Sequence, residues 1–134
     1  FYEWREVDGK KYPYFIYLKN KETFSFAGLW EEWADCSTGE VLRTFSILTT
    51  DANPLMEQIH NTKKRMPVIL PREREQEWIK NGLGGKEIAA LIRPLDDTLM
   101  NAHPISKLIN SRSLNRNVAA IQEEYDYPEL EKVK

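Results

Sequence analysis

Cysteine is almost missing from this sequence: Cys36 is the only one among 134 residues. An intramolecular disulfide is therefore excluded, and so is a cysteine-rich zinc site. On the same ground we expect a reducing, cytoplasmic setting. Cys36 lies in the turn ADCSTGE between Asp35 and Glu40. Because nearby negative charge disfavours a thiolate, we expect an unreactive thiol.

Long apolar runs and excess positive charge are also missing. No stretch of about 18 or more apolar residues exists, so we expect neither a membrane-spanning helix nor a membrane partner. No charged-then-apolar leader is present, although the sequence begins at Phe1 rather than Met, so we expect its natural N-terminus to have been removed or to lie upstream. The formal net charge is −2 and the pI about 5.8. This excludes the global basic footprint of most nucleic-acid binders and leaves only a local patch.

Strand-forming sequence fills the first part of the chain. Residues 1–8 start within a strand, and Asp8-Gly9 is a dipeptide typical of hairpin turns. The segments 10–20, 22–33 and 41–50 are rich in aromatic and β-branched residues, with short turns between them. We therefore expect an antiparallel meander.

Helical patterns follow the strands. Asp51 can cap a helix whose first turn holds Pro54, with Leu55, Met56 and Ile59 as its apolar stripe. Further elements are expected in this order: a buried strand over 66–71, helices over 71–82 and 86–94, and a strand or short helix over 96–111. The fold class is α+β, as a single domain. Residues 111–134 read as a polar loop and a poorly packed acidic tail.

His60 is the first candidate for chemistry. It ends the helix predicted near residue 54, and Lys63, Lys64 and Arg65 follow it closely. One interpretation is a helix-terminal histidine that caps carbonyl groups, favoured there by the helix dipole. The other is a general acid or base beside an anion site, since histidine transfers protons best near neutral pH. Spacing alone favours the capping role.

Glu3 lies between Tyr2 and Trp4 in the first predicted strand. Its carboxylate either faces solvent, which is more common, or enters an apolar pocket, which would suit proton transfer. The four tryptophans of the sequence are expected mainly in the core. His103 precedes Pro104 in an extended segment without a partner in the local sequence. No metal ligands and no cofactor are predicted.

An ordered set of segments adds to these observations. FYEW (1–4), PYFIY (13–17), FAGLWEEW (26–33), TFSILTTDANPLMEQIHN (44–61) and RMPVILP (65–71) follow one another, and HPISKLIN ends the set at residue 110. Together they resemble the SRAP family, the SOS response-associated peptidases that crosslink to abasic sites in DNA. The resemblance covers residues 1–110 as the larger, C-terminal part of an SRAP domain. It implies a curved, mostly antiparallel β-sheet or barrel flanked by short helices.

The resemblance also implies a function. Family members capture abasic sites in single-stranded DNA through an N-terminal cysteine, which forms a thiazolidine with the sugar aldehyde. The same site removes the initiator methionine or a short propeptide. The matching residues here are Glu3 and His60 for proton transfer, and Arg65, Trp4 and Thr49 for DNA and pocket contacts. A DNA partner would place the protein at the nucleoid.

Two departures from the family pattern follow from the sequence. The nucleophilic cysteine belongs to an N-terminal segment upstream of FYEW, and Cys36 does not match it, so we expect this chain alone to be inactive. HNTKKRMP also holds more residues between His60 and Arg65 than the family's H-x-R-x-P pattern. Sheet edges left open without the upstream segment would favour a dimer.

Two other functions remain open from the residues. One is a peptidase that uses the same site on other proteins. The other is a non-catalytic binding or structural module, in which Glu3 and His60 are ordinary surface and capping residues.

Overall fold

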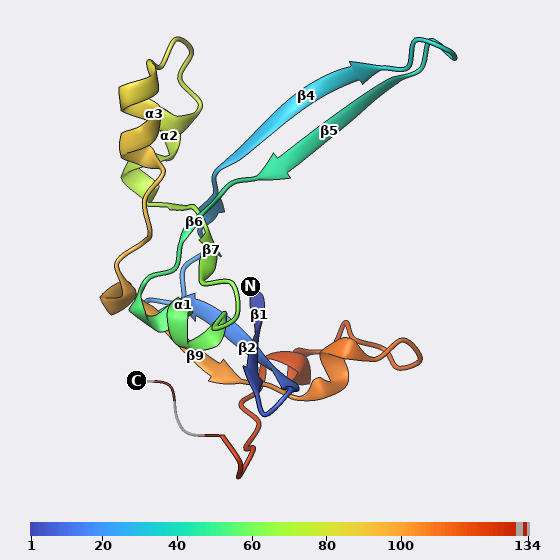
Figure 1. Cartoon of the computed structure of the whole chain (residues 1–134), viewed down its shortest axis with the longest axis vertical. Helices are drawn as coiled ribbons and strands as arrows, with labels where there is room; N and C mark the ends of the chain where they lie inside the picture. Colours follow the sequence, from blue (N-terminus) through green and yellow to red (C-terminus); the bar gives the residue numbers. More distant parts are fainter. Residues whose placement is uncertain (131–132, 134) are drawn as a thin grey trace. The chain divides into compact units, whose positions relative to one another are not determined.

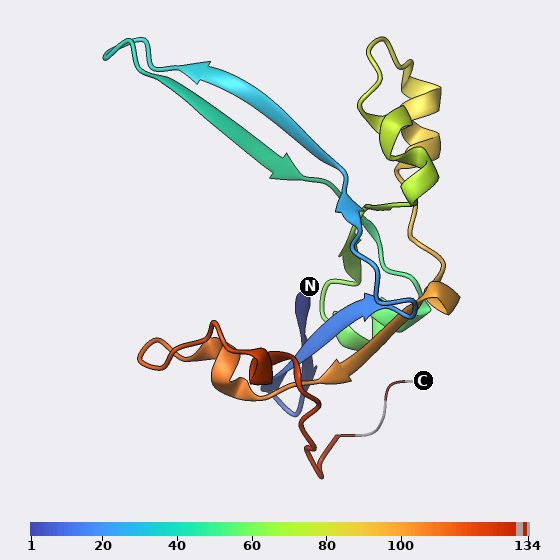
Figure 2. The same ribbon diagram turned by 180° about the vertical axis from the view of Figure 1, so that it is seen from behind.

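A computed structural model describes residues 1–130 and 133 of the chain. Their contacts divide into two compact units. The first unit comprises Phe1–Thr23, Ala52–Arg65 and Asp96–Lys134, and the second comprises Phe24–Asp51 and Met66–Leu95. Figures 1 and 2 show the elements of both units from opposite sides.

A three-stranded antiparallel sheet organises the first unit. Its order is β1 (Tyr2–Val7), β2 (Lys10–Leu18) and β9 (Met100–Pro104). Asp8 and Gly9 join β1 to β2 with φ values of 50° and 71°, as the predicted hairpin turn requires. The expected meander is wrong, because β2 pairs with β9, a strand from the far end of the sequence, and not with the next strand along the chain.

The two faces of this sheet differ. Tyr12, Tyr14 and Ile16 point to one face and are each at most 2% exposed. Helix α1 (Pro54–Ile59) lies against β1 and buries its predicted apolar stripe in the same unit. On the other face, aromatic rings run across the strands with centroid separations of 5.4 to 5.8 Å: Tyr2 to Phe15, Phe15 to Tyr17, and Phe15 to His103.

The cap of α1 is Asn53 and not Asp51. The Asn53 side chain accepts a hydrogen bond from the Met56 N–H at 2.9 Å, and Pro54 occupies the first turn as predicted. Asn53 is the only buried polar residue of the described core. The predicted cap is therefore wrong by two residues, because asparagine directly before the proline is itself a preferred N-cap residue.

The segment after β9 folds back on the first unit. Three 3₁₀ turns flank or belong to it: η2 (Asp97–Leu99), η3 (Lys107–Asn110) and η4 (Ala119–Gln122). Tyr127 is 9% exposed, and its hydroxyl donates to the Ile105 carbonyl at 2.9 Å. Lys107 Nζ lies 4.6 Å from the centre of the Tyr12 ring. Ile121 and Tyr127 are thus buried anchors of a segment whose other residues between 112 and 129 are exposed. Residues 131, 132 and 134 lie outside the described part.

The second unit contains three short strand pairs. They are β3 (Ser25–Phe26) with β8 (Ile69–Leu70), β4 (Gly28–Ala34) with β5 (Val41–Ile47), and β6 (Thr49–Asp51) with β7 (Arg65–Pro67), of which Met66 and Pro67 belong to this unit. Its core is Ala27, Val68 and Leu70, against which Trp78 packs. The fold is thus mixed α+β with mostly antiparallel strands, and the described strands do not close into a barrel.

The β4–β5 hairpin exposes most of its apolar side chains. Trp30 and Phe45 face each other across the strands and are 72% and 80% exposed. The predicted core position is therefore wrong for Trp30, and also for Trp33, which is 52% exposed. Gly39 closes the predicted turn with a φ of 74°.

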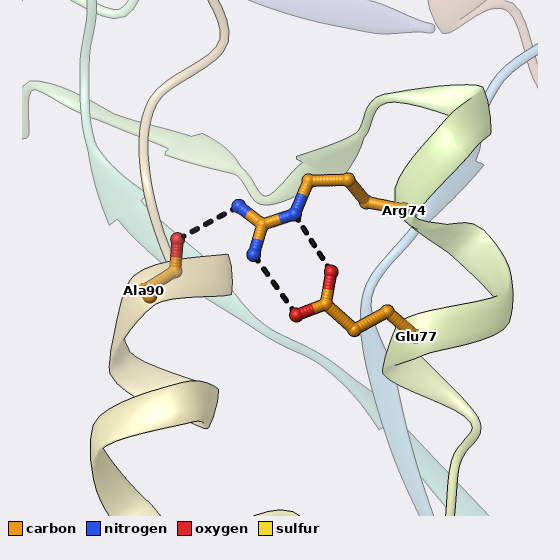
Figure 3. Close-up of polar contacts among 3 residues, drawn as sticks. All are labelled: Arg74, Glu77 and Ala90. Atoms are coloured by element: carbon orange, nitrogen blue, oxygen red, sulfur yellow. Dashed lines mark hydrogen bonds and ion pairs between the residues drawn. The ribbon is translucent and has the colours of Figure 1, made fainter.

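Two helical segments complete the second unit. The helix predicted over 71–82 is instead a 3₁₀ turn, η1 (Arg72–Arg74), followed by α2 (Glu75–Trp78), while the helix predicted over 86–94 is α3 (Gly85–Leu91). Arg74 joins them, because its guanidinium donates two hydrogen bonds to the Glu77 carboxylate, at 2.9 and 3.1 Å, and one to the Ala90 carbonyl at 3.2 Å (Figure 3).

Candidate functional site

A pocket of about 420 Å³ opens in the first unit. Strand β1 forms one wall, and the turn that follows α1 forms another. Its lining is mostly polar and carries both signs of charge: Glu3, Trp4, Glu6, Lys11, His60, Thr62 and Asn110. The sequence-predicted catalytic pair, Glu3 and His60, is therefore brought together in one cavity.

A proline in β2 determines which backbone groups of β1 face this pocket. Trp4 lies opposite Pro13, which has no N–H to donate. The Pro13 carbonyl instead accepts from the Ile105 N–H at 2.9 Å, on the side away from β1. Because hydrogen-bonded and non-hydrogen-bonded pairs alternate in an antiparallel ladder, the backbone groups of Trp4 and Glu6 point to the free edge of β1.

The Glu3 carboxylate is held at this free edge. Its Oε1 accepts a hydrogen bond from the Trp4 N–H at 3.2 Å. Its Oε2 lies 3.9 Å from Nδ1 of His60, which is beyond hydrogen-bond distance. The side chain is 24% exposed, between the two environments that the sequence left open. One carboxylate oxygen is thus anchored, and the other faces the histidine across a gap.

His60 is both a helix cap and a pocket residue. Its backbone N–H donates to the Met56 carbonyl at 2.7 Å and ends α1. Its Nδ1 lies 2.8 Å from the Arg65 carbonyl oxygen. A carbonyl oxygen only accepts hydrogen bonds, so Nδ1 carries the proton. In the neutral ring Nε2 is then the basic nitrogen, available for proton transfer.

Asn61, the residue after His60, contacts β1 directly. Its Oδ1 accepts from the Glu6 N–H at 3.1 Å, and its Nδ2 donates to the Glu6 carbonyl at 2.7 Å. Sequence reasoning did not single out Asn61, Lys11, Thr62 or Asn110. Only Lys11 had a local signal, because the Asp8-Gly9 turn places it opposite Glu6.

The other predicted site residues have different surroundings. Trp4 is half-buried and lines the pocket. Arg65 has an exposed side chain, and its contact with His60 is made by its backbone carbonyl. Thr49 is exposed on β6 and Cys36 is exposed in the turn between β4 and β5, both in the second unit. The pocket is lined by residues of the first unit alone.

Metal-binding clusters and membrane-spanning helices are both missing from the part of the chain that the structure describes. Through residue 130 and at 133, no group of three or more His, Cys, Asp or Glu side chains is arranged to hold a metal ion. None of the helices in that part combines the length and the apolarity needed to cross a membrane.

Comparison with known proteins extends the resemblance seen in the sequence. The family model for SOS response associated peptidase (SRAP) matches residues 1–112. The chain is 43% identical over 117 residues to the abasic site processing protein YoqW of Bacillus subtilis, covering 86% of this chain and 50% of that protein. It is 28% identical over 134 residues to the abasic site processing protein HMCES of Xenopus tropicalis, covering 86% and 38%.

Solved structures agree with the fold. The crystal structure of a protein from Bacteroides thetaiotaomicron superposes with a TM-score of 0.87 at 41% identity, over 93% of this chain and 53% of that one. The chain spans about half the length of the curated relatives it matches, such as YoqW. The family model covers most of the chain, and the pocket residues lie within it. The chain belongs to the SRAP family of SOS response associated peptidases.

Proposed function

We propose that this chain is the larger part of a protein that protects abasic sites in single-stranded DNA by covalent capture. The observation that carries the proposal is the pocket on the free edge of β1, where Glu3 and His60 meet at 3.9 Å. The names of the relatives support it, since YoqW and HMCES are both abasic site processing proteins.

The proposed chemistry needs two groups that move protons. The α-amine of an N-terminal cysteine attacks the ring-opened sugar aldehyde, and water leaves as an imine forms. The cysteine sulfur then adds to the imine carbon and closes a thiazolidine. In this scheme, His60 Nε2 takes a proton from the attacking amine and passes it to the aldehyde oxygen. Glu3 in its protonated form then protonates the departing hydroxyl, and the resulting carboxylate takes the thiol proton as the sulfur adds to the imine carbon. The two groups have different anchors, a carbonyl for His60 and a backbone N–H for Glu3.

The nucleophile of this scheme is a cysteine outside these 134 residues. The single cysteine here, Cys36, is exposed in a turn of the second unit, and the pocket belongs to the first. We therefore expect the 134-residue chain by itself to form no adduct. In the whole protein the same pocket would remove the residue that precedes the nucleophilic cysteine.

DNA contacts are proposed for three further residues. Trp4 lines the pocket and offers an aromatic surface for a base or a sugar. Arg65 has an exposed side chain next to the carbonyl that anchors His60 and would contact a phosphate. Thr49 is assigned to the DNA side by the family resemblance alone.

The experiment mixes the whole protein with a single-stranded oligonucleotide that carries one abasic site, and denaturing gels detect the adduct. Glu3→Gln and His60→Ala are expected to slow adduct formation on the order of a hundredfold each, the usual contribution of a general acid or base. Glu22→Gln and His103→Ala are the matched controls, because neither residue lines the pocket. No adduct from the wild-type protein, or equal rates in all variants, would contradict the proposal.

A further inference from the structure

The contact between Asn61 and β1 has no part in the proposed chemistry, yet it joins the two segments that carry the catalytic candidates. We propose that Asn61 is a positioning residue that fixes the separation between Glu3 and His60. This inference rests on the proposed function for its kinetic consequence, but its geometric content stands on the contacts alone.

The Asn61 carboxamide takes the place of a strand residue beside β1. An extended residue presents one N–H and one C=O to its neighbour, and the carboxamide presents the complementary pair. It accepts from the Glu6 N–H at 3.1 Å and donates to the Glu6 carbonyl at 2.7 Å. These groups face the free edge because Pro13 determines the alternation of the ladder. One side chain thus satisfies a position at which β1 has no partner strand.

This contact joins the two walls of the pocket. Glu3 lies on β1, three residues before Glu6, whose backbone Asn61 binds. The Glu3 carboxylate accepts a hydrogen bond from the neighbouring Trp4 N–H. His60 directly precedes Asn61, and its ring is anchored on the Arg65 carbonyl. Each catalytic candidate is therefore oriented within its own segment. Asn61 makes the hydrogen bonds that connect the turn after α1 with the strand.

The contact made by Asn61 is expected to affect the reaction rate more than the stability of the fold. The Asn61 side chain is exposed, so its two hydrogen bonds are expected to contribute little to folding stability. The sheet and α1 are also held by buried side chains, such as Ile16 of β2 and Ile59 of α1. The rate is more sensitive, because a displacement of about 1 Å between reacting groups can cost on the order of a hundredfold.

The test uses the whole protein with Asn61→Ala, Asn61→Asp and Asn61→Gln. Adduct formation is followed in single turnovers over a range of protein concentrations. Asn61→Ala is expected to lower the limiting rate about tenfold or more while the half-saturating concentration stays within about twofold of wild type, because DNA contacts are kept. Asn61→Asp loses the donor to the Glu6 carbonyl and should behave similarly. Asn61→Gln keeps the carboxamide and should recover part of the rate.

The control is Asn101→Ala. The Asn101 side chain accepts from the Ala102 N–H on β9, and it does not line the pocket. It should leave the limiting rate unchanged. An Asn61→Ala protein with wild-type rate would overturn the inference, and so would a loss confined to the half-saturating concentration.

A crystal structure of the Asn61→Ala protein separates this inference from the proposed function. The Glu3 Oε2 to His60 Nδ1 distance is expected to increase from 3.9 Å, with the rest of the sheet unchanged. An unchanged distance would refute the positioning role, even in a protein that forms no adduct. A wild-type protein without adduct refutes the proposed function, and the crystallographic distance then still decides the role of Asn61.

Discussion

At the scale of single residues, His60 is defined more by its neighbours than by its position in the sequence. Its Nδ1 faces the Arg65 carbonyl at 2.8 Å, whereas the Glu3 carboxylate is 3.9 Å away. The carbonyl therefore sets the tautomer, and the carboxylate stays free for a separate role. The helix-capping role of His60 is compatible with a role in proton transfer, because its backbone caps α1 and its ring lines the pocket.

The tautomer can be measured directly. We expect neutral His60 to carry its proton on Nδ1, because the facing oxygen cannot donate. Long-range nitrogen–proton NMR spectra of the whole protein at alkaline pH distinguish the two tautomers. His103 is a suitable internal comparison, since its Nε2 lies 2.8 Å from the Gln122 carbonyl and should show the opposite pattern. A His60 ring protonated on Nε2 would contradict the assigned base.

How far the site is visible in the sequence also depends on the residue. Glu3 and His60 follow from motif resemblance, because their neighbours carry recognisable patterns. The lining residues Thr62 and Asn110 could not be predicted, because they approach the pocket only through the tertiary fold. The separation in sequence between Asn61 and Glu6 hides their contact in the same way.

At the scale of elements, local chemistry predicts turns well and pairing poorly. Asp8-Gly9 and Gly39 adopt positive φ angles that few other residues accept, so their turns are readable from the sequence. The pairing of β2 with β9 is not readable, because distant strands leave no local signal. The helix predicted over 71–82 shortens to α2 (Glu75–Trp78) because it contains few apolar residues to bury.

The link between α2 and α3 gives a pH-dependent prediction. Hydrogen bonds from Arg74 lower the pKa of the Glu77 carboxyl below its ordinary value of 4.5. The folded state therefore holds this proton less firmly than the unfolded state. The stabilisation is present above about pH 4.5 and is lost as the pH falls through the lower, folded pKa. Arg74 stays charged throughout, since its own pKa is raised by the same contact.

Thermal unfolding of the whole protein between neutral and acidic pH tests this link. Glu77→Gln is expected to lower the unfolding midpoint at neutral pH and to reduce its dependence on pH below 4.5. Glu40→Gln is the control, because Glu40 is an exposed turn residue of the same unit. Identical pH profiles for wild type and Glu77→Gln would count against a contribution from the ion pair.

At the scale of the whole molecule, we expect the exposed apolar side chains of the β4–β5 hairpin to be covered in the whole protein. A two-stranded hairpin is only marginally stable in water, and this one leaves Trp30, Trp33 and Phe45 more than half exposed. Exposed aromatic side chains in such number mark an interaction surface. The chain also covers only about half of relatives such as YoqW.

Hydrogen exchange tests whether contacts outside these 134 residues stabilise the hairpin. In the isolated 134-residue chain we expect the amides of β4 and β5 to exchange quickly and the chain to self-associate, as sedimentation would show. In the whole protein the same amides should be protected. The amides of β2 are the internal reference, because that strand is paired on both sides in the first unit. Strong protection of β4 and β5 in an isolated, monomeric chain would contradict this expectation.

Pro13 has a consequence for how the first unit folds. A hairpin of β1 and β2 formed one residue out of register would place Pro13 opposite Glu3 or Arg5, whose backbone groups face β2. The β1 carbonyl opposite Pro13 would lose its hydrogen-bond donor, at a cost of about 1–3 kcal/mol once it is buried. Every side chain of the shifted strand would also move to the opposite face of the sheet. Misaligned hairpins are thus disfavoured before β9 joins the sheet. We therefore expect Pro13 to favour the native register of β1 and β2, and through this register the position of Glu3 at the pocket.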